Sequence, residues 1–233
     1  MSFHGQKKAG INNISLDVML GVPGQTKESL KSTLDFCISS GVPHLSCYIL
    51  KIEENTPFFR MRNKLPFPSD DDTADMYLFM CEYLEEHGIM QYEISNFAVP
   101  GFESRHNLKY WHDEEYLGIG ASAHSFLGGK RTYYPRDIEY FISGNEHLTE
   151  GDGGDEEEFC MLALRLREGI TQERFYARFH HEIPQKMLES AKQYEKYGLC
   201  SCENGGISLT RRGFFTLQLR NIRNYLIDIN ISG

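Results

Sequence analysis

The stretch "NNISLDVMLGVPGQT", residues 12–26, decides the fold of this 233-residue chain. Its apolar run, Ile14–Leu20, predicts a buried strand that ends at a Gly/Pro turn. Asp17 interrupts that run, and a carboxylate in a buried strand is costly unless it has partners. Asp17 is therefore either an acid that binds a ribose or an amino group, or a member of a structural hydrogen-bond network.

A helix and a second strand follow this turn directly. Leu30, Leu34 and Cys37 fall on one face of a helix predicted over about residues 26–40, and Gly41 is a natural stop. The segment "HLSCYILKI", residues 44–52, is rich in residues that favour sheets. Strand, helix and strand with short links make a βαβ unit, so the sequence predicts a parallel sheet that binds ligands at the carboxyl ends of its strands.

The rest of the chain predicts further elements around this unit. A second helix is expected from Ser69, which has capping-box spacing to Asp72, and "QYEISNFA", residues 91–98, is expected to be one short strand. The balance of acidic and basic residues shifts near residue 150. The sequence beyond this point predicts three helices, an Asn-Gly-Gly hairpin and a final helix over about residues 211–227. That order suggests a small winged-helix-like domain.

Composition limits the classes of protein to consider. The net charge of −9 argues against general, charge-driven binding of nucleic acid. No apolar run approaches the roughly 20 residues that span a membrane, and the first residues lack the apolar segment of a secretory signal. The chain is therefore expected to be cytoplasmic, with its six cysteines reduced and mostly packed. The pair Cys200-x-Cys202 is too tight for a usual structural zinc pair.

Residues 104–124, "SRHNLKYWHDEEYLGIGASAH", gather histidines and aromatic residues in a segment too polar to be core. His106 can bind haem iron through one imidazole nitrogen, and Tyr110, four residues on, shares its face of a helix. Trp111 adds a flat ring, although a histidine among aromatic residues is also common as a hydrogen-bonded surface group. The run "GIGASA", residues 118–123, nearly matches a dinucleotide fingerprint but lacks its βαβ context, so its glycines more simply permit close backbone approach.

Several blocks of the sequence resemble the HemW family. They are "NNISLDVMLGVPGQTKESL", "HLSCYILKIEENTPF", "QYEISNFAVPGFESRHNLKYW" and "EEYLGIGASAHSF", and the tail with "EFCMLALRLREGI" and "GISLTRRGFF" is similar to the family's carboxyl-terminal domain. HemW proteins are radical S-adenosylmethionine (SAM) proteins similar to HemN, the oxygen-independent coproporphyrinogen III oxidase. The resemblance implies an α/β fold, namely the C-terminal part of a partial (β/α)6 TIM-like radical-SAM barrel plus a small winged-helix-like α+β domain. It implies a last barrel βαβ unit over residues 1–66, a barrel extension over 67–149 and the C-terminal domain over 150–233.

The resemblance also implies site residues. His106 matches the histidine of a His-Asn-x-x-Tyr-Trp motif thought to serve haem, with His106 on the iron and with Tyr110 and Trp111 beside the macrocycle. It implies SAM contacts at Asp17, Lys51 and His124. No catalytic residue is assigned.

One departure from the family limits what this chain is expected to do. The family's Cys-x3-Cys-x2-Cys, which holds a 4Fe–4S cluster, is absent from the sequence. The chain is therefore expected to be a C-terminal portion without the cluster-binding half, and not to be active as an enzyme by itself.

The favoured function is haem binding and delivery, with haem or porphyrin as ligand and an unidentified haem-acceptor protein as partner. Two alternatives stay open. The full-length protein could be an oxygen-independent coproporphyrinogen III oxidase, or the tail could be a winged-helix nucleic-acid-binding regulator that uses Arg211 and Arg212, although the acidic charge leads us to expect no nucleic acid. Open sheet edges also predict a possible homo-oligomer.

Overall fold

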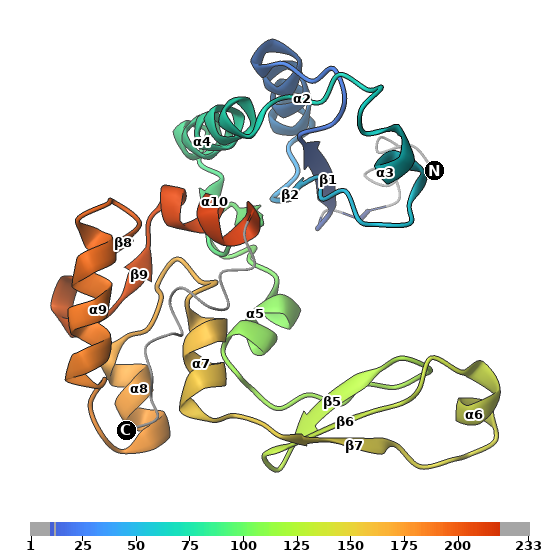
Figure 1. Ribbon diagram of the computed structural model, residues 1–233, viewed down its shortest axis with the longest axis vertical. Helices are drawn as coiled ribbons and strands as arrows, with labels where there is room; N and C mark the ends of the chain where they lie inside the picture. Colours follow the sequence, from blue (N-terminus) through green and yellow to red (C-terminus); the bar gives the residue numbers. More distant parts are fainter. Residues whose placement is uncertain (1–9, 12, 220–233) are drawn as a thin grey trace.

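The computed structural model describes residues 10–11 and 13–219, which contain three sheets and the helices that connect their strands. Figure 1 shows the path of the chain from the first sheet through helix α5 into a long antiparallel arm, and from there into the C-terminal helices. We call residues 115–152 the arm. The mixture of parallel and antiparallel strands with covering helices confirms the predicted α/β class.

The first sheet has four strands in the order β1-β2-β4-β3. β1 (Ser15–Leu20) and β2 (His44–Ile49) are parallel, and α2 (Lys27–Ser40) makes the crossover between them, so the predicted βαβ unit is confirmed. β4 (Asn96–Ala98) pairs with β2 in the antiparallel sense. β1 is therefore an edge strand of this sheet in the described part of the chain.

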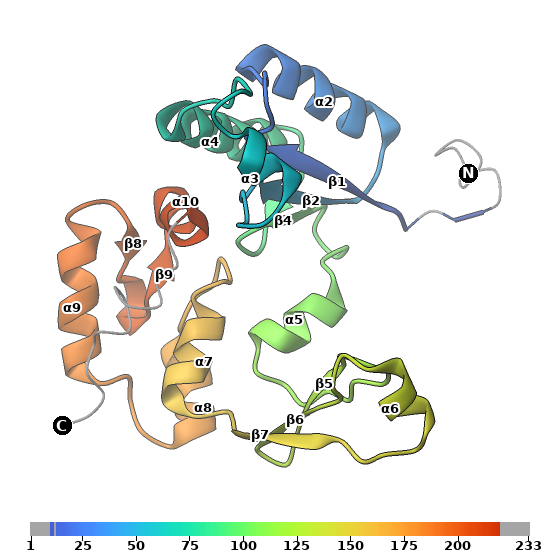
Figure 2. The same ribbon diagram turned by 45° about the vertical axis from the view of Figure 1, so that its right-hand side comes forward.

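The two long helices on this sheet begin where the sequence indicates. Thr26 caps α2 in a reciprocal capping box, and Gly41 ends it in the left-handed conformation at φ 64°. α4 (Asp70–Glu86) begins with the expected capping box at Ser69. Figure 2 shows both helices on the same side of β1 and β2, where their apolar faces enter one core.

The opposite face of β1 is open, which corrects the expectation that Asp17 is buried. Side chains alternate along a strand, so Val18 and Leu20 enter the core while Asp17 and Met19 point the other way. Asp17 is exposed. Its carboxylate therefore keeps its contact with solvent and needs no structural partner to offset desolvation.

Residues 91–98 contain a chain reversal, so the expectation of a single strand there is wrong. β3 (Met90–Gln91) turns back into β4, and the two strands pair antiparallel. The carboxylate of Glu93, which is 1% exposed, accepts hydrogen bonds from the Ser95 amide at 2.9 Å and from the Asn96 side chain at 2.5 Å. These bonds stabilise the reversal, and this tertiary environment overrides the local strand propensity.

The middle of the chain forms the arm and the short helices near it. Their bounds are α3 Pro57–Met61, α5 Arg105–Trp111, β5 His124–Leu127, β6 Lys130–Tyr133, α6 Ile138–Ile142 and β7 Leu148–Asp152. The three strands pair antiparallel in the order β5-β6-β7. Among the described residues of the arm, Phe126 is the only large apolar side chain that is buried, and it lies outside the main core cluster. The arm therefore lies outside the main core, and contacts other than core packing attach it to the rest of the molecule.

The C-terminal part has the predicted order of elements. Its bounds are α7 Glu156–Ala163, α8 Gln172–Phe179, α9 Gln185–Glu195, β8 Cys200–Ser201, the 3-10 turn η1 Glu203–Gly205, β9 Ser208–Leu209 and α10 Arg211–Leu219. β8 and β9 pair antiparallel across the Asn-Gly-Gly turn, which confirms the hairpin. The predicted continuation of the last helix to residue 227 lies outside the described residues. The apolar side chains of this part join the same core cluster as α2 and α4.

Candidate functional site

Helix α5 places His106 and Tyr110 one turn apart. Ser104 caps the helix by accepting a hydrogen bond from the Asn107 amide at 3.3 Å. The Tyr110 hydroxyl lies 3.1 Å from Nε2 of His106, and the two rings meet edge to face with centroids 5.0 Å apart. His106 is exposed, so a ligand can reach its imidazole directly from solvent.

A row of aromatic rings leads from His106 to the arm. The Tyr110 ring packs against the Tyr116 ring with centroids 4.5 Å apart. The Tyr116 hydroxyl accepts a hydrogen bond from Nη1 of Arg131 on β6 at 3.2 Å, and its main chain pairs with Phe126 on β5. The helix that carries His106 is thus in contact with the arm.

Trp111 contacts the C-terminal part of the chain. The guanidinium of Arg165 lies 4.3 Å from the centroid of the Trp111 ring, and the indole Nε1 is buried with no hydrogen-bond partner among the described residues. Burial lowers the pKa of Arg165, and the charge of Glu93 opposes that effect. Trp111 lies five residues after His106, about 140° round the helix. The Arg165 guanidinium therefore covers one face of the Trp111 ring. The Trp111 side chain leaves the helix in a different direction from those of His106 and Tyr110.

A hydrogen-bond chain runs from β1 to the first turn of α5. The Ser15 hydroxyl lies 2.7 Å from Nδ1 of His44, and Nε2 of His44 lies 2.9 Å from the Tyr92 hydroxyl. That hydroxyl accepts a hydrogen bond from the Ser104 amide at 3.2 Å. Burial lowers the pKa of His44 and raises the pKa of Tyr92 to about 12, so both side chains favour their neutral forms. These three hydrogen bonds connect the start of α5 to the first sheet.

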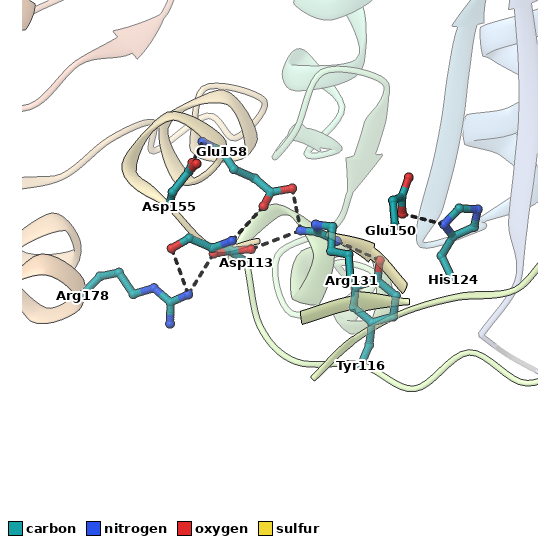
Figure 3. Close-up of polar contacts among 9 residues, drawn as sticks. Asp113, Tyr116, His124, Arg131, Glu150, Asp155, Glu158 and Arg178 are labelled. Carbon is teal, nitrogen blue, oxygen red and sulfur yellow. Dashed lines mark hydrogen bonds and ion pairs between the residues drawn. The ribbon is translucent and has the colours of Figure 1, made fainter. Parts of the chain in front are cut away.

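A cluster of charged side chains joins the arm to the C-terminal helices (Figure 3). Asp113, which is 6% exposed, lies 3.1 Å from Arg178 of α8 and 3.5 Å from Arg131 of β6. Arg131 also pairs with Glu158 of α7 at 2.7 Å. Burial raises the pKa of Asp113, and the two guanidinium groups oppose that effect. The charged form of this carboxylate therefore depends on both arginines.

Sequence reasoning missed this cluster, although the glycines at 153 and 154 were a usable signal. A Cβ on Gly154, whose φ is 78°, would collide with Arg178 and Phe126. A Cβ on Gly153 would crowd Arg131 and Glu158. The glycine pair lets the main chain pass directly beside the charged groups. The partners themselves lie too far apart along the chain for any local spacing to connect them.

The three expected SAM contacts are divided between two sheets. Asp17 lies in β1, and Lys51 follows the end of the neighbouring strand β2 of the same sheet. His124 begins β5 in the arm, where its Nδ1 lies 3.2 Å from Glu150 (Figure 3). The structure therefore places Asp17 within β1, Lys51 beyond the end of the adjacent strand β2, and His124 in a different sheet.

The glycines of residues 118–123 play two different parts. A Cβ on Gly118 would collide with the main-chain carbonyl of His124, so the expected close backbone approach is confirmed there. Gly120 has φ 117° with open space around it, and it serves the conformation of the turn.

Arg211, which the nucleic-acid hypothesis would place on DNA, is engaged inside the molecule. Its guanidinium pairs with Glu85 of α4, and this contact joins the C-terminal helix to the helices of the first sheet. Arg212 lies beside a hollow that is also lined by Asp70 and Asp71, an acidic neighbourhood that repels phosphate.

Comparisons with known proteins agree with one another. The HemN C-terminal domain family matches residues 156–216. The protein named heme chaperone HemW of Bacillus subtilis (strain 168) is 34% identical over 224 residues, which cover 91% of this chain and 59% of that protein. The protein of the same name from Lactococcus lactis is 35% identical over 89% of this chain and 57% of its own length. This chain thus spans somewhat more than half of the length of these relatives.

Two further likenesses concern radical-SAM proteins. "Radical S-adenosyl methionine domain-containing protein 1, mitochondrial" of Danio rerio is 32% identical over 70% of this chain and 40% of that protein. The solved structure of coproporphyrinogen III oxidase (HemN) from Escherichia coli, described as a radical SAM enzyme, superposes with a TM-score of 0.71 at 17% identity. The match covers 99% of this chain and 57% of that one, and it establishes a shared fold. This chain is thus similar to the heme chaperone HemW proteins over most of its own length, and it has the fold of HemN.

Proposed function

We propose that this chain binds haem through His106 and takes part in its delivery to another protein. The observation that carries the proposal is the exposed His106 imidazole on α5, whose Nε2 is 3.1 Å from a tyrosine hydroxyl. A neutral imidazole is a common axial ligand of haem iron. The name of the curated relatives, heme chaperone HemW, supports the same ligand.

The residues around His106 fit a loosely held macrocycle. Tyr110 offers a ring edge beside the imidazole, and its hydroxyl can leave Nε2 when iron arrives. Trp111 is less well suited to pack beside the macrocycle, because Arg165 already covers one face of its ring. A site with one protein ligand at the surface leaves the other side of the iron open, which suits transfer to an acceptor.

The proposal extends to SAM and to the place of action. Asp17 in β1 and Lys51, just beyond the end of the parallel strand β2, are the residues that we expect to contact SAM, with His124 as a third contact. The part of the chain that the structure describes has no helix long and apolar enough to cross a membrane. We propose a cytoplasmic location, where cysteines such as the buried Cys37 and Cys47 stay reduced.

Titration of the chain with haemin tests the haem proposal. We expect a Soret band that shifts on binding and that is lost in His106→Ala. His87→Ala is the matched control, because His87 is also exposed and also at a helix end but lies on α4. Equal spectra for the wild type and the His106 variant would refute the assignment.

Delivery requires its own measurement. Haem-loaded chain mixed with apomyoglobin is expected to transfer its haem, as followed by the myoglobin spectrum, faster than the same haem is released to buffer. Retention of all haem in the presence of this acceptor would reject delivery while leaving binding in place.

A further inference from the structure

A cavity of about 650 Å³ lies on the arm, separate from His106. Ser125, Leu127 and Thr132 line it from β5 and β6. Side chains alternate along strands, so Phe126 and Arg131 point to the other face of the sheet, where the charged cluster lies. The volume is within the range of about 300–1,000 Å³ that is typical of small-molecule sites.

The rim of this cavity holds large apolar side chains in contact with water. Leu117 is 67% exposed and Ile119 is 79% exposed, and both line the cavity together with Phe141 of the short helix α6. Single exposed apolar residues are ordinary, but several that converge on one concave site are typical of a surface that receives an apolar molecule.

The polar part of the lining favours an anionic group. It includes the ammonium of Lys130 and the hydroxyls of Thr132 and Thr149, and no carboxylate of the described residues lines the cavity. Lys130 pairs with Asp152, but both side chains are largely exposed, so this pair is weak and the ammonium can change partner. In a chain of net charge −9, a lining with a cation and no acid is selective for a negative ligand group.

We propose that this cavity is a second ligand site, which binds an apolar molecule that carries a carboxylate. The apolar body lies between Leu117, Ile119 and Phe141, and the carboxylate accepts hydrogen bonds from Lys130 and Thr132. Two kinds of molecule share this chemistry, an acyl chain that ends in a carboxylate and a flat macrocycle with carboxylate side chains. Neither needs iron, so the site does not depend on the proposed role of His106.

Calorimetric titration of the 233-residue chain with sodium dodecanoate and with metal-free protoporphyrin IX tests the proposal and separates the two kinds of ligand. Binding of dodecanoate alone assigns the cavity to acyl carboxylates. Binding of protoporphyrin alone assigns it to the macrocycle, and mutual displacement shows that both occupy one place. The absence of heat from both ligands would overturn the proposal.

Three variants locate the binding. Thr149→Trp puts an indole into the cavity from an exposed position on β7, and we expect at least about a tenfold loss of affinity. Lys130→Gln removes the charge-assisted hydrogen bond and is expected to weaken binding about tenfold. Arg136→Gln removes a positive charge from the same arm outside the lining, and its affinity is expected to equal that of the wild type.

The outcomes for the two sites are distinguishable. Circular dichroism shows whether each variant keeps its fold. His106→Ala is expected to lose the haemin spectrum and to keep the binding of dodecanoate or protoporphyrin in the cavity. Unchanged affinity in Thr149→Trp would overturn the cavity proposal whatever the result at His106.

Discussion

At the scale of single residues, the Tyr110 hydroxyl occupies Nε2 of His106, the atom that would bind iron in the proposed haem site. Tyr110→Phe keeps the ring that packs against Tyr116 and removes the competing hydrogen bond. A typical net hydrogen bond contributes about 1 kcal/mol, so the dissociation constant for haemin is expected to fall about fivefold. Titration at the Soret maximum measures it, with the exposed Tyr176→Phe on α8 as the unchanged control. A weaker affinity would show that the hydroxyl contacts haem instead of competing with it.

Asp113 lies between two arginines in the charged cluster that joins the arm to the C-terminal helices. Asp113→Asn keeps its shape but removes the charge between Arg131 and Arg178. Breaking a buried ion pair leaves an uncompensated charge, so the variant is expected to lose about 2 kcal/mol or more of unfolding free energy in urea. Asp152→Asn removes an exposed partner of Lys130 and is expected to change the same quantity by less than about 1 kcal/mol. Equal losses in the two variants would contradict this account.

Single residues also show where the sequence is informative. The helical spacing of His106 and Tyr110 is a local property, and it predicts the contact that the structure contains. The partners of Asp113 could not be predicted, because Arg178 lies 65 residues further along the chain. The exposure of Asp17 could not be predicted either, because it depends on which face of the sheet is covered.

At the scale of elements, the hydrogen bonds through His44 connect the first sheet to α5. They predict that the stability of the protein depends on pH. Burial lowers the pKa of His44 below its ordinary 6.5, so the unfolded chain takes up this proton at a higher pH than the folded one. Stability from this group is therefore present above about pH 6.5, and it is lost as the pH falls from there through the folded pKa. Each tenfold difference in proton affinity between the folded and unfolded chains corresponds to about 1.4 kcal/mol of that stability.

Urea unfolding of the wild type and of His44→Gln between about pH 7.5 and pH 5 measures this contribution. The difference between the two free energies of unfolding is expected to shrink as the pH falls, because carboxylates that titrate in this range affect both proteins alike. Asp17 and Glu103 are the charged groups that oppose the lowering of the His44 pKa, and neither is changed. A difference that stays constant with pH would show that His44 does not titrate in this window.

Elements were predictable in proportion to how local their signals are. The capping boxes of α2 and α4 and the Asn-Gly-Gly hairpin depend on a few neighbouring residues, and their elements begin and turn where those residues indicate. The reversal between β3 and β4 depends on the buried carboxylate of Glu93, whose environment includes Arg165 from the C-terminal part. The sequence of residues 91–98 alone does not show that Glu93 has this environment.

At the scale of the whole molecule, the core and the candidate ligand sites are separate. The main core cluster joins the first sheet to the C-terminal helices, whereas the arm is held by Phe126 and by the charged cluster. Helix α5, which carries His106, lies between these two parts (Figure 1). The proposed cavity lies on the arm. Both candidate sites therefore lie outside the main core cluster.

The first sheet has an open edge at β1 among the residues that the structure describes, and this edge predicts self-association. β1 pairs on one side with β2, and Met19, 41% exposed, stands on its uncovered face. An edge strand with exposed apolar side chains is a template for pairing with another chain, so the average mass in sedimentation velocity is expected to rise with protein concentration. Met19→Lys places a charge on this edge and is expected to keep the chain monomeric. Phe36→Lys, at an exposed apolar position on α2 away from the edge, is expected to associate like the wild type, and a monomeric wild type at all concentrations would show that β1 is already protected.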